Sequence, residues 1–420
     1  MLKKILLKGP LLTRSGYGEQ ARYALRSLRS RPDLFEVFVQ PLTWGQTSWI
    51  SEEDPERRWI DQTIEKTIGY IQQGGNFDLS LQVTIPSEWE HMAPVNVGYT
   101  AGIETSQVSH QWIQSANEMD RIIVISNHAK STFDGTTYEG VNEDTQERIV
   151  LQTTVPIEPI SYPVKTYDSL EPLELDLKHD FNFLTVAQWG PRKNMGNTLR
   201  WFAEEFKDDP VGLVVKTNMA KNCVMDRELL ELKLKEILDS YTDLKCSIYL
   251  LHGDMTDEEM HGLYVHPQIN ALVALTHGEG FGLPLYEAAY TGIPVIASGW
   301  SGHMDFLVDE ENTEHFYNVA FDIAVIPEDA VWESVLIKDS MWAYPREHDD
   351  KAQMRLCYEN LTSETDGDEI KQQYLDYAEV LKERFNEEKM YAKFVDLVYG
   401  EQIDVHSWLD QLSDEIEEHE

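Results

Sequence analysis

The sequence is poor in cysteine, in long apolar runs and in basic residues. Its three cysteines are far apart and show no CxxC spacing, which argues against a disulfide framework and structural zinc and points to a reducing compartment. No window approaches the roughly 18 continuous apolar residues of a membrane span. The apolar N-terminal stretch is interrupted at residues 8–10, too early for a signal peptide. We therefore expect a protein without an integral membrane segment in the cytoplasm, or in the host cytoplasm for a viral protein.

The shortage of basic residues gives the chain a strongly negative charge. It contains 35 Lys and Arg against 74 Asp and Glu, a formal net charge of −39 at pH 7. Such a field opposes nonspecific binding to nucleic acid and to anionic lipid. The sequence also lacks a run rich in Lys and Arg. We interpret the charge as a solvated acidic surface, which makes nucleic acid a disfavoured partner.

Strand-like and helix-like segments alternate in two successive runs, the signature of parallel sheets with crossover helices. A helix is expected over 17–30, and the spacing of Ile60, Ile64, Ile68 and Ile71 predicts that these residues share the face of a second helix. The predicted strands are 3–8, 35–40, 77–83, 95–100 and 121–126 in the first run and 181–189, 211–216, 246–253, 269–276 and 293–298 in the second.

Residues 155–176 separate the two runs and read as a linker, because they contain four prolines and little periodicity. The prediction is therefore two α/β domains hinged near 155–180, with a ligand in the cleft between them. The expected division is an N-terminal domain at 1–160, a linker at 161–180, a C-terminal domain at 181–382, and at 383–420 a helix that packs back on the first domain, with an acidic tail.

The most informative segment is THGEGFGLPLYEA, residues 276–288. It follows an apolar run that predicts a strand, and it opens a short helix in which Pro284 suits the first turn. Its glycines leave backbone N–H groups bare at the positive end of the helix dipole, which is how proteins bind phosphate groups. Glu279 and Glu287, with seven residues between them, add acceptors for sugar hydroxyls. The segment predicts a site for a sugar attached to a diphosphate.

Two further turns lie between a strand and a helix. Gly16 and Gly18 fall where backbone can approach a ligand, although the motif is not a full GxGxxG and a plain turn is the alternative. In QWGPRKN (188–194), Arg192 and Lys193 precede a helix, and two cations there oppose the helix dipole unless an anion lies between them. A diphosphate would supply that anion, and two exposed charges are the alternative.

Other polar residues are expected near the same edge of the cleft. Lys216 ends a predicted strand, and a glycine-rich loop at 299–306 follows another. The candidates for acid–base chemistry by residue type are His110, His128, His277 and His303. No metal site is predicted, since no paired Cys, His or Asp spacing occurs.

Four segments together resemble the retaining nucleotide-sugar glycosyltransferases of the GT-B type, in particular the large family 4, or glycosyl transferases group 1. They are PRKN (191–194), HGD (252–254), EGFGLPLYEA (279–288) and PVIASGWSGHMDF (294–306), within a match over roughly 180–310. The resemblance implies an α/β GT-B fold, with two Rossmann-like domains facing each other across a cleft. It also implies a hexosyl- or pentosyltransferase that uses a UDP- or GDP-sugar as donor and requires no cofactor.

The resemblance further implies roles for single residues. Glu279 matches the carboxylate that contacts the donor sugar, and Glu287 the one that holds the ribose hydroxyls. Lys193 matches the lysine that neutralises the donor diphosphate, and His110 sits where related enzymes can place a cleft histidine. Donor contacts are expected from Gly16, Gly18, Lys216, Phe281, Gly282 and Leu283.

The chain departs from the family pattern at one point. Many members carry an arginine five or six residues before the lysine, where this chain has Gln188 and Ala187. Arg192 or Lys216 is expected to take over the role of that arginine. The predicted mechanism stabilises the leaving diphosphate with Lys193 and Arg192, without a metal. Because the acceptor attacks the same face and a donor phosphate oxygen takes its proton, the two glutamates do not act as a hydrolase pair.

The acceptor is not identified by any motif. We expect the N-terminal domain to bind it through loops such as 43–56 and 84–94, where Trp44, Trp49 and Trp89 could stack on a sugar or a base. A carbohydrate, a lipid-linked sugar, a protein, a small molecule and, less favoured by the charge, a hydroxymethylated DNA base of the viral type all remain open. The alternatives to a transferase are an epimerase or phosphorylase of the same fold and a non-catalytic sugar-nucleotide-binding module.

Overall fold

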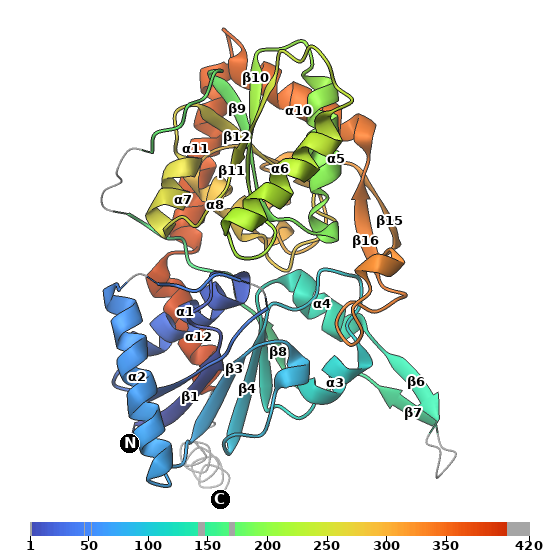
Figure 1. The fold of residues 1–420 in the computed structure, drawn as a ribbon. Helices are drawn as coiled ribbons and strands as arrows, with labels where there is room; N and C mark the ends of the chain where they lie inside the picture. Colours follow the sequence, from blue (N-terminus) through green and yellow to red (C-terminus); the bar gives the residue numbers. More distant parts are fainter. Residues whose placement is uncertain (1, 46, 52, 142–147, 168–172, 401–420) are drawn as a thin grey trace, which may run out of the picture.

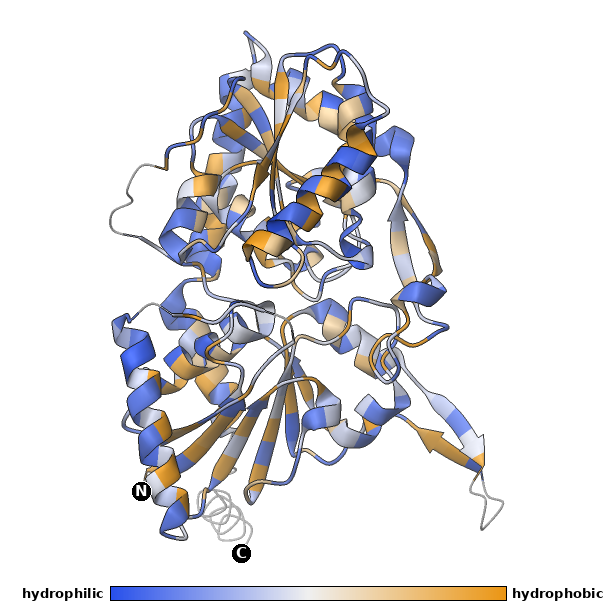
Figure 2. Ribbon diagram, viewed as in Figure 1, coloured by the Kyte–Doolittle hydropathy of each residue, from blue (hydrophilic) through white to orange (hydrophobic). Residues whose placement is uncertain are grey.

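Two six-stranded parallel sheets form the framework of the molecule, one above the other in Figure 1. The computed structural model describes residues 2–45, 47–51, 53–141, 148–167 and 173–400. Helices lie on both faces of each sheet, as the alternating sequence pattern predicts. Figure 2 shows apolar residues concentrated along the strands and hydrophilic residues over much of the helices, although α6 exposes apolar residues such as Leu229 and Leu232.

The N-terminal sheet has the strand order β2-β1-β3-β4-β5-β8. Its strands are β1 (Lys3–Gly9), β2 (Phe35–Pro41), β3 (Leu79–Val83), β4 (Val95–Thr100), β5 (Arg121–Val124) and β8 (Ile157–Pro159). Its helices are α1 (Gly16–Arg29), α2 (Pro55–Gln72), α3 (His110–Ala116) and α4 (Asn127–Gly135), with a 3₁₀ turn η1 (Pro86–Glu88) and a separate hairpin of β6 (Tyr138–Val141) and β7 (Arg148–Leu151).

The C-terminal sheet has the order β11-β10-β9-β12-β13-β14, the 3-2-1-4-5-6 pattern of a Rossmann fold. Its strands are β9 (Phe181–Gln188), β10 (Val211–Asn218), β11 (Ser247–Leu251), β12 (Ile269–Ala274), β13 (Val295–Ser298) and β14 (Tyr317–Val319). Its helices are α5 (Met195–Glu205), α6 (Val224–Leu238), α7 (Asp257–Tyr264), α8 (Leu283–Thr291), α9 (Met304–Leu307), α10 (Glu347–Thr362) and α11 (Gly367–Arg384), with 3₁₀ turns η2 (Pro191–Lys193) and η3 (Glu328–Ala330).

The first residues of the linker predicted at 155–176 belong to the N-terminal domain. Residues 157–159 form β8, which adds an edge strand to the first sheet, and Ile160, Tyr162 and Val164 are buried. Proline at the end of β8 is compatible with pairing because an edge strand leaves one side of its backbone unpaired. The connection between the domains is therefore shorter than the proline-containing segment 155–176 predicted from the sequence.

The helix face predicted from the isoleucines of α2 is only partly buried. Ile60 is buried, but Ile68 and Ile71 are about half exposed, and Thr63 and Thr67 face the protein instead. The reason is the position of α2 beside β2, the edge strand, where the hydroxyl of Thr67 accepts the backbone N–H of Val39 at 2.9 Å. A polar side chain thus satisfies an edge donor that an isoleucine would leave unpaired.

The last described helix, α12 (Glu387–Tyr399), packs on the N-terminal domain against α1 (Figure 1). The Tyr23 hydroxyl donates to the Met390 carbonyl at 3.1 Å, and the Tyr23 ring lies 5.2 Å from that of Phe394. The chain therefore crosses between the domains twice. The expected acidic tail lies outside the described residues.

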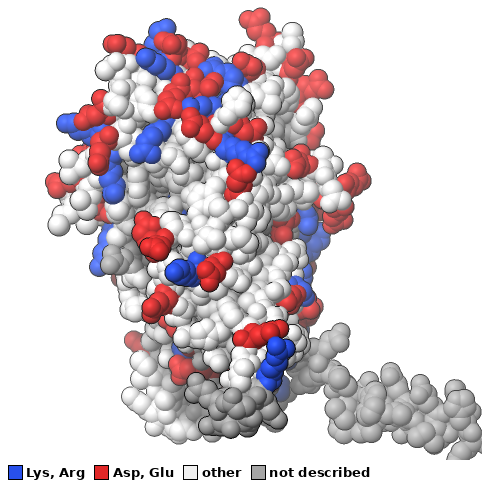
Figure 3. Space-filling model, turned by 90° about the vertical axis from the view of Figure 1, so that its right-hand side faces the viewer, with Lys and Arg blue, Asp and Glu red and all other residues white. Residues whose placement is uncertain are grey.

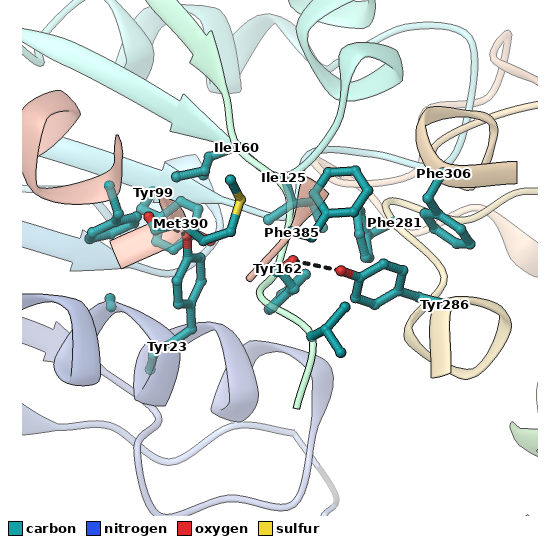
Figure 4. Close-up of a cluster of buried hydrophobic side chains, with 14 of the residues drawn as sticks. Tyr23, Tyr99, Ile125, Ile160, Tyr162, Phe281, Tyr286, Phe306, Phe385 and Met390 are labelled. Atoms are coloured by element: carbon teal, nitrogen blue, oxygen red, sulfur yellow. Dashed lines mark hydrogen bonds between the residues drawn. The ribbon is translucent and has the colours of Figure 1, made fainter. Parts of the chain in front are cut away.

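An aromatic core continues from one domain into the other (Figure 4). Phe281 and Tyr286 of the C-terminal domain lie close to Tyr162, and the Tyr286 hydroxyl donates to the Tyr162 carbonyl at 3.0 Å. Tyr23 and Tyr99 extend the cluster into the N-terminal domain. This packing fixes the turn of residues 278–282 against the domain junction.

A two-stranded ribbon, β15 (Phe321–Val325) with β16 (Met341–Pro345), runs along the side of the C-terminal domain (Figure 1). The segment between its strands reaches the N-terminal domain, where the Ser109 hydroxyl donates to the Ser334 carbonyl at 2.8 Å and Val335 is buried in the core around α3. The ribbon is thus a third connection between the domains.

Candidate active site

The turn between β12 and α8 is held by close backbone packing. A Cβ on Gly278 would lie 2.4 Å from the Glu104 carbonyl oxygen, and one on Gly302 would lie 2.0 Å from that of Gly280. Gly282 adopts a left-handed conformation, with φ of +96°, just before α8 begins. These positions require glycine because side chains would collide with the neighbouring loops or strain the backbone. The turn predicted from the sequence therefore exists, pressed between both domains.

The carboxylate of Glu279 lies between two cations. Its Oε1 is 2.5 Å from Lys193 Nζ, and its Oε2 is 3.0 Å from an Arg192 guanidinium nitrogen. Lys193 and Arg192 come from η2 at the end of β9, so the C-terminal ends of two neighbouring strands bring the three charges together. The anion that the sequence requires between the two cations is, in this structure, Glu279 itself.

Arg192 also contacts the other domain. Its Nη2 lies 3.1 Å from Glu104 Oε1, in the loop after β4. Its Nη1, the nitrogen that faces Glu279, also donates to the Gly278 carbonyl at 2.6 Å. Glu104 belongs to none of the motifs that the sequence predicts for the site. A single acidic residue in a loop at the end of a strand is the only signal that could have identified it.

Burial and charge act in opposite directions on this cluster. Burial disfavours the ionised form of Glu279, but the attraction of Lys193 and Arg192 prevails and lowers its pKa to about 2. Burial, together with repulsion from Arg192, lowers the pKa of Lys193 despite its contact with Glu279. Glu279 is therefore ionised at neutral pH and does not serve there as a proton donor.

The loop after β13 forms hydrogen bonds with the backbone of Glu279. The Glu279 backbone N–H donates to the Ser301 hydroxyl at 2.9 Å, and the Gly302 N–H donates to the Glu279 carbonyl at 2.9 Å. His303 is almost fully buried beside this loop and bonds through Nε2 to the Ser298 carbonyl. Burial lowers its pKa. The glycine-rich segment predicted to reach the cleft thus contacts the backbone of Glu279 directly.

Three of the four candidate histidines lie at this junction, and His110 does not. Burial and the nearby His303 lower the pKa of His128 to about 4. His277 stacks on Trp342. His110 is exposed at the start of α3 and packs edge-on against Tyr138 of the hairpin, with ring centroids 5.9 Å apart. His110 thus lies against the hairpin, and its expected place in the cleft stays a prediction.

The second carboxylate, Glu287, lies in a different environment. Burial raises its pKa to about 7, although Lys165 and the Tyr264 hydroxyl favour the ionised form. Lys165 itself bridges Glu19 of α1 and Asp257 of α7, at 2.9 and 2.7 Å. Glu19, Lys165 and Glu287 line a cavity of about 20 Å³, which is room for about one water molecule. Of the two glutamates in the E-x(7)-E motif, Glu279 is therefore paired with two cations, whereas the negative charge of Glu287 is not fully balanced by a cation.

The glycines at the start of α1 differ in what they do. A Cβ on Gly18 would lie 2.1 Å from the Thr13 carbonyl oxygen, so the turn itself requires this glycine, and the Gly18 N–H donates to the Ser15 hydroxyl. Gly16 is exposed, with nothing within 4 Å of such a Cβ. Close approach of a ligand to the backbone is therefore open at Gly16 but blocked at Gly18.

The remaining predicted donor residues are divided between the core and the cleft edge. The Phe281 side chain points into the aromatic core (Figure 4) and is 2% exposed, so only its backbone can face a ligand. Leu283 is partly exposed. Lys216 donates to the Gly253 carbonyl, near Arg14, which donates to the Met255 carbonyl at 2.8 Å. Gln188, at the family's arginine position, donates to the Met219 carbonyl.

A larger groove of about 640 Å³ opens beside the η2 turn, between α5 and α6. Trp189, Asn194, Arg200 and Lys233 contribute to its lining, but Arg192 and Lys193 do not. The two cations point instead toward Glu279. Among the described residues, no group of three or more His, Cys, Asp or Glu side chains is arranged to hold a metal ion.

Residues 177–322 match the family model Glycosyl transferases group 1, which covers the η2 turn, Glu279 and Glu287. The chain is a glycosyltransferase with the GT-B fold. The family resemblance and the two Rossmann-like domains predicted from the sequence are thereby confirmed. No curated protein sequence matches this glycosyltransferase. None of the helices in the described parts of the chain is long and apolar enough to cross a membrane.

Solved structures share the fold at low sequence identity. Sucrose-phosphate synthase from Thermosynechococcus elongatus is 13% identical, with a TM-score of 0.58, over 94% of this glycosyltransferase and 98% of that chain. An E. coli structure described as trehalose-6-phosphate bound with UDP-2-fluoro glucose is 10% identical, with a TM-score of 0.56 over the same shares. A mutant of S. aureus TarM, in complex with fondaparinux, alpha-GlcNAc-glycerol and UDP, is 12% identical with a TM-score of 0.48; the match covers 77% of the present chain and 55% of TarM.

Proposed function

We propose that this chain is a retaining glycosyltransferase that moves a sugar from a nucleoside-diphosphate sugar to an acceptor hydroxyl without a metal ion. One observation carries the proposal: a buried glutamate, Glu279, is held by Lys193 and Arg192 at the domain junction, inside the region that matches the group 1 family. The cations are suited to a diphosphate, and the carboxylate is suited to sugar hydroxyls.

Donor binding would exchange one anion for another. Without donor, the charges of Lys193 and Arg192 are balanced by Glu279 and Glu104. A diphosphate brings additional negative charge and competes with Glu279 for Lys193, because phosphate oxygens are strong acceptors for an ammonium group. Glu279 is then free to accept hydrogen bonds from the sugar. Glu287, beside the 20 Å³ cavity, is suited to the ribose hydroxyls once that cavity opens.

The chemistry requires one bond to form and one to break at the anomeric carbon. The bond between this carbon and the β-phosphate oxygen breaks, and its electron pair leaves with the diphosphate. The acceptor oxygen bonds to the carbon on the same face, and its proton passes to a donor phosphate oxygen. Lys193 stabilises the charge that develops on the leaving group, which is where preplaced positive charge lowers the barrier most. No protein nucleophile is involved, in contrast to hydrolysis by two flanking carboxylates.

The acceptor is proposed to bind on the N-terminal side of the cleft. Trp44 packs against Tyr17 with the ring planes tilted by 40° and the centroids 4.3 Å apart, and Trp49 is 49% exposed. The Ser48 hydroxyl donates to the Lys221 carbonyl of the other domain, so this loop spans the cleft. Trp89 is buried against Gly98 and is a core residue, which removes it as a stacking platform. Exposed aromatic rings at such a place suit the apolar face of a sugar.

A donor panel tests the proposal. We expect one UDP- or GDP-sugar to raise the melting temperature of the protein, with UDP-sugars the first to try because relatives of this fold were solved with UDP ligands. Incubation with that donor and candidate acceptors should yield a product whose anomeric configuration, read by NMR, matches that of the donor. An inverted product would refute the retaining mechanism. Failure of every nucleotide sugar to stabilise the protein would indicate a non-catalytic module.

A further inference from the structure

Lys165, in the segment that connects the domains, forms ion pairs with both of them. Its Nζ lies 2.9 Å from Glu19 Oε1, in the first turn of α1, and 2.7 Å from Asp257 Oδ2, at the start of α7. The α1 helix belongs to the N-terminal domain and α7 to the C-terminal domain. We call this bridge from Glu19 through Lys165 to Asp257 the clasp, because one side chain ties the two domains together.

The two ends of the clasp differ in how firmly they are held. Glu19 also accepts from Arg26 at 3.0 Å, and its side chain is only 12% exposed. Arg26 in turn donates to both carboxylate oxygens of Glu56, at 2.7 and 2.8 Å. The Asp257 side chain is 55% exposed, and exposed ion pairs contribute little to stability. The contact between Lys165 and Asp257 is therefore the part of the clasp that opens most easily.

The clasp lies beside the carboxylate that we propose binds the ribose. Glu19, Lys165 and Glu287 line the same cavity of about 20 Å³, which is room for about one water molecule. A ribose ring is several times larger than a water molecule. A nucleoside therefore cannot occupy the space beside Glu287 until one wall of the cavity moves away.

The other walls of the cavity are fixed by the core. Tyr162, Tyr286 and Tyr290 are at most 4% exposed and belong to the aromatic cluster that joins the domains (Figure 4). Their displacement would expose a large apolar area to water, which is unfavourable. Separation of Lys165 from Asp257 breaks only a half-exposed ion pair. The clasp is thus the wall that can open while the core stays intact.

Ion pairs elsewhere provide a comparison. Oppositely charged side chains also lie next to one another on the outer surface of the C-terminal domain (Figure 3). Lys351 bridges Glu204 of α5 and Glu347 of α10, and its side chain is 20% exposed, against 21% for Lys165. Both lysines thus bridge two carboxylates at equal exposure, but the partners of Lys351 belong to one domain. Lys351 therefore serves as a matched control for the clasp.

We propose that the clasp is an autoinhibitory contact, which keeps the ribose site beside Glu287 shut in the ligand-free protein until a nucleoside diphosphate enters. The proposal rests on the proposed function, which assigns the ribose to Glu287. Since the clasp stabilises only the closed, ligand-free form, part of the binding free energy is used to open it, and the apparent affinity is lowered. Loss of Lys165 should therefore tighten nucleotide binding, whereas loss of a residue that contacts the nucleotide would weaken it.

Titration calorimetry of the full chain with UDP and with GDP tests the clasp. Lys165→Met removes a positive charge and Asp257→Asn a negative one, so their direct effects on a bound diphosphate have opposite signs. Because both break the clasp, we expect both to lower the Kd of the nucleotide that binds, by roughly two- to fivefold. Lys351→Met should leave the Kd unchanged. Any other result for the two clasp variants, with the Kd unchanged, raised or moved in opposite directions, would overturn the proposal.

The reactivity of a thiol in the cavity tests the clasp without a ligand. In a Cys223→Ser background, which removes the exposed native thiol and leaves two buried ones, Glu287→Cys places a thiol on the cavity wall. Its reaction with a thiol reagent should become roughly two- to fivefold faster on addition of Lys165→Met, and not on addition of Lys351→Met. Equal rates would overturn the clasp even in a protein that binds UDP. Faster labelling in a protein that binds neither UDP nor GDP would support the clasp and count against the proposed function.

Discussion

Arg192 of the C-terminal domain and Glu104 of the N-terminal domain lie 3.1 Å apart, and the other terminal nitrogen of the same guanidinium lies 3.0 Å from Glu279. A rigid fork of donors joins two carboxylates that belong to different domains. The position of Glu279 relative to the first domain is therefore set through Arg192. This makes Arg192 a positioning residue in the ligand-free protein, beside Lys193 as the cation available to a diphosphate.

Replacement of Arg192 by lysine tests this relationship. Lysine keeps the charge but cannot bond to both carboxylates in the same way, so we expect a loss of about 1–3 kcal/mol in the free energy of unfolding and a lower kcat/KM. Urea denaturation and steady-state kinetics measure the two effects. Arg227→Lys is the control, because Arg227 pairs with Glu231 on the exposed face of α6 and its replacement should cost less than about 0.5 kcal/mol. Equal losses in both variants would remove the special role of Arg192.

Glu279→Gln should retain the fold and lose transfer activity. The amide keeps the shape of the side chain but removes the negative charge that pairs with Lys193 and that we propose accepts from the sugar. We expect kcat/KM to fall by about 10²-fold or more, a loss typical for a charged contact to the reacting group. Circular dichroism and product formation with the donor found in the panel measure fold and rate. Glu359→Gln, on the exposed face of α10, should behave as wild type. An active Glu279→Gln enzyme would rule out the site.

The pKa of Glu287 predicts a pH-dependent stability. Burial raises its pKa to about 7 in the folded protein, above the ordinary value of a glutamate near 4.3. The folded state therefore binds a proton that the unfolded state releases, so Glu287 costs stability increasingly as the pH rises from about 4.5 to 7, and the full cost persists above. Its upper limit is about 4 kcal/mol, at roughly 1.4 kcal/mol per pH unit.

Glu287→Gln should remove this cost. The difference in melting temperature between the variant and the wild type should grow in favour of the variant from pH 5 to pH 8, measured by differential scanning calorimetry without ligand. Glu359→Gln provides the control, since its carboxylate is exposed on α10 and its removal should leave the melting temperature close to that of the wild type. A difference for Glu287→Gln that does not change with pH would show that the Glu287 carboxylate is solvated in solution.

The proposed reaction needs no divalent cation. Lys193 carries the positive charge that in other enzymes is supplied by a metal bound to the diphosphate. We expect a chelator to leave the transfer rate unchanged within about twofold and Lys193→Ala to abolish it. A rate that disappears with chelator and returns with manganese would contradict this account of the leaving group.

Sequence patterns predicted the parts of this molecule that depend on neighbours along the chain. The apolar residues Met195, Leu199 and Phe202 recur at helical spacing and are buried on one face of α5. Thr256 and Glu259, three positions apart, form a capping box at the start of α7. Both sheets follow from the alternation of apolar strands and amphipathic helices. In these cases the periodicity and the cap are local, so a single sequence contains them.

Features that depend on distant residues were missed. The bond from Val39 to Thr67 buries a threonine where an isoleucine face was expected, and Glu104 meets Arg192 across 88 positions of sequence. The carboxylate of Glu279 takes the place expected for a ligand's diphosphate. His110 packs against Tyr138 of the hairpin, while His303, in the loop at 299–306, lies beside Glu279. Such pairings arise only when loops from both sheets come together.

The return of α12 to the first domain has a consequence for synthesis. The helical layer over the first sheet is made from residues that leave the ribosome at opposite times, α1 early and α12 late, and Tyr23 finds Met390 and Phe394 only when both are present. The second sheet, in contrast, draws all of its strands from 181–319. Although it is translated second, the C-terminal domain can finish its core first, and the domain translated first is the last to be completed.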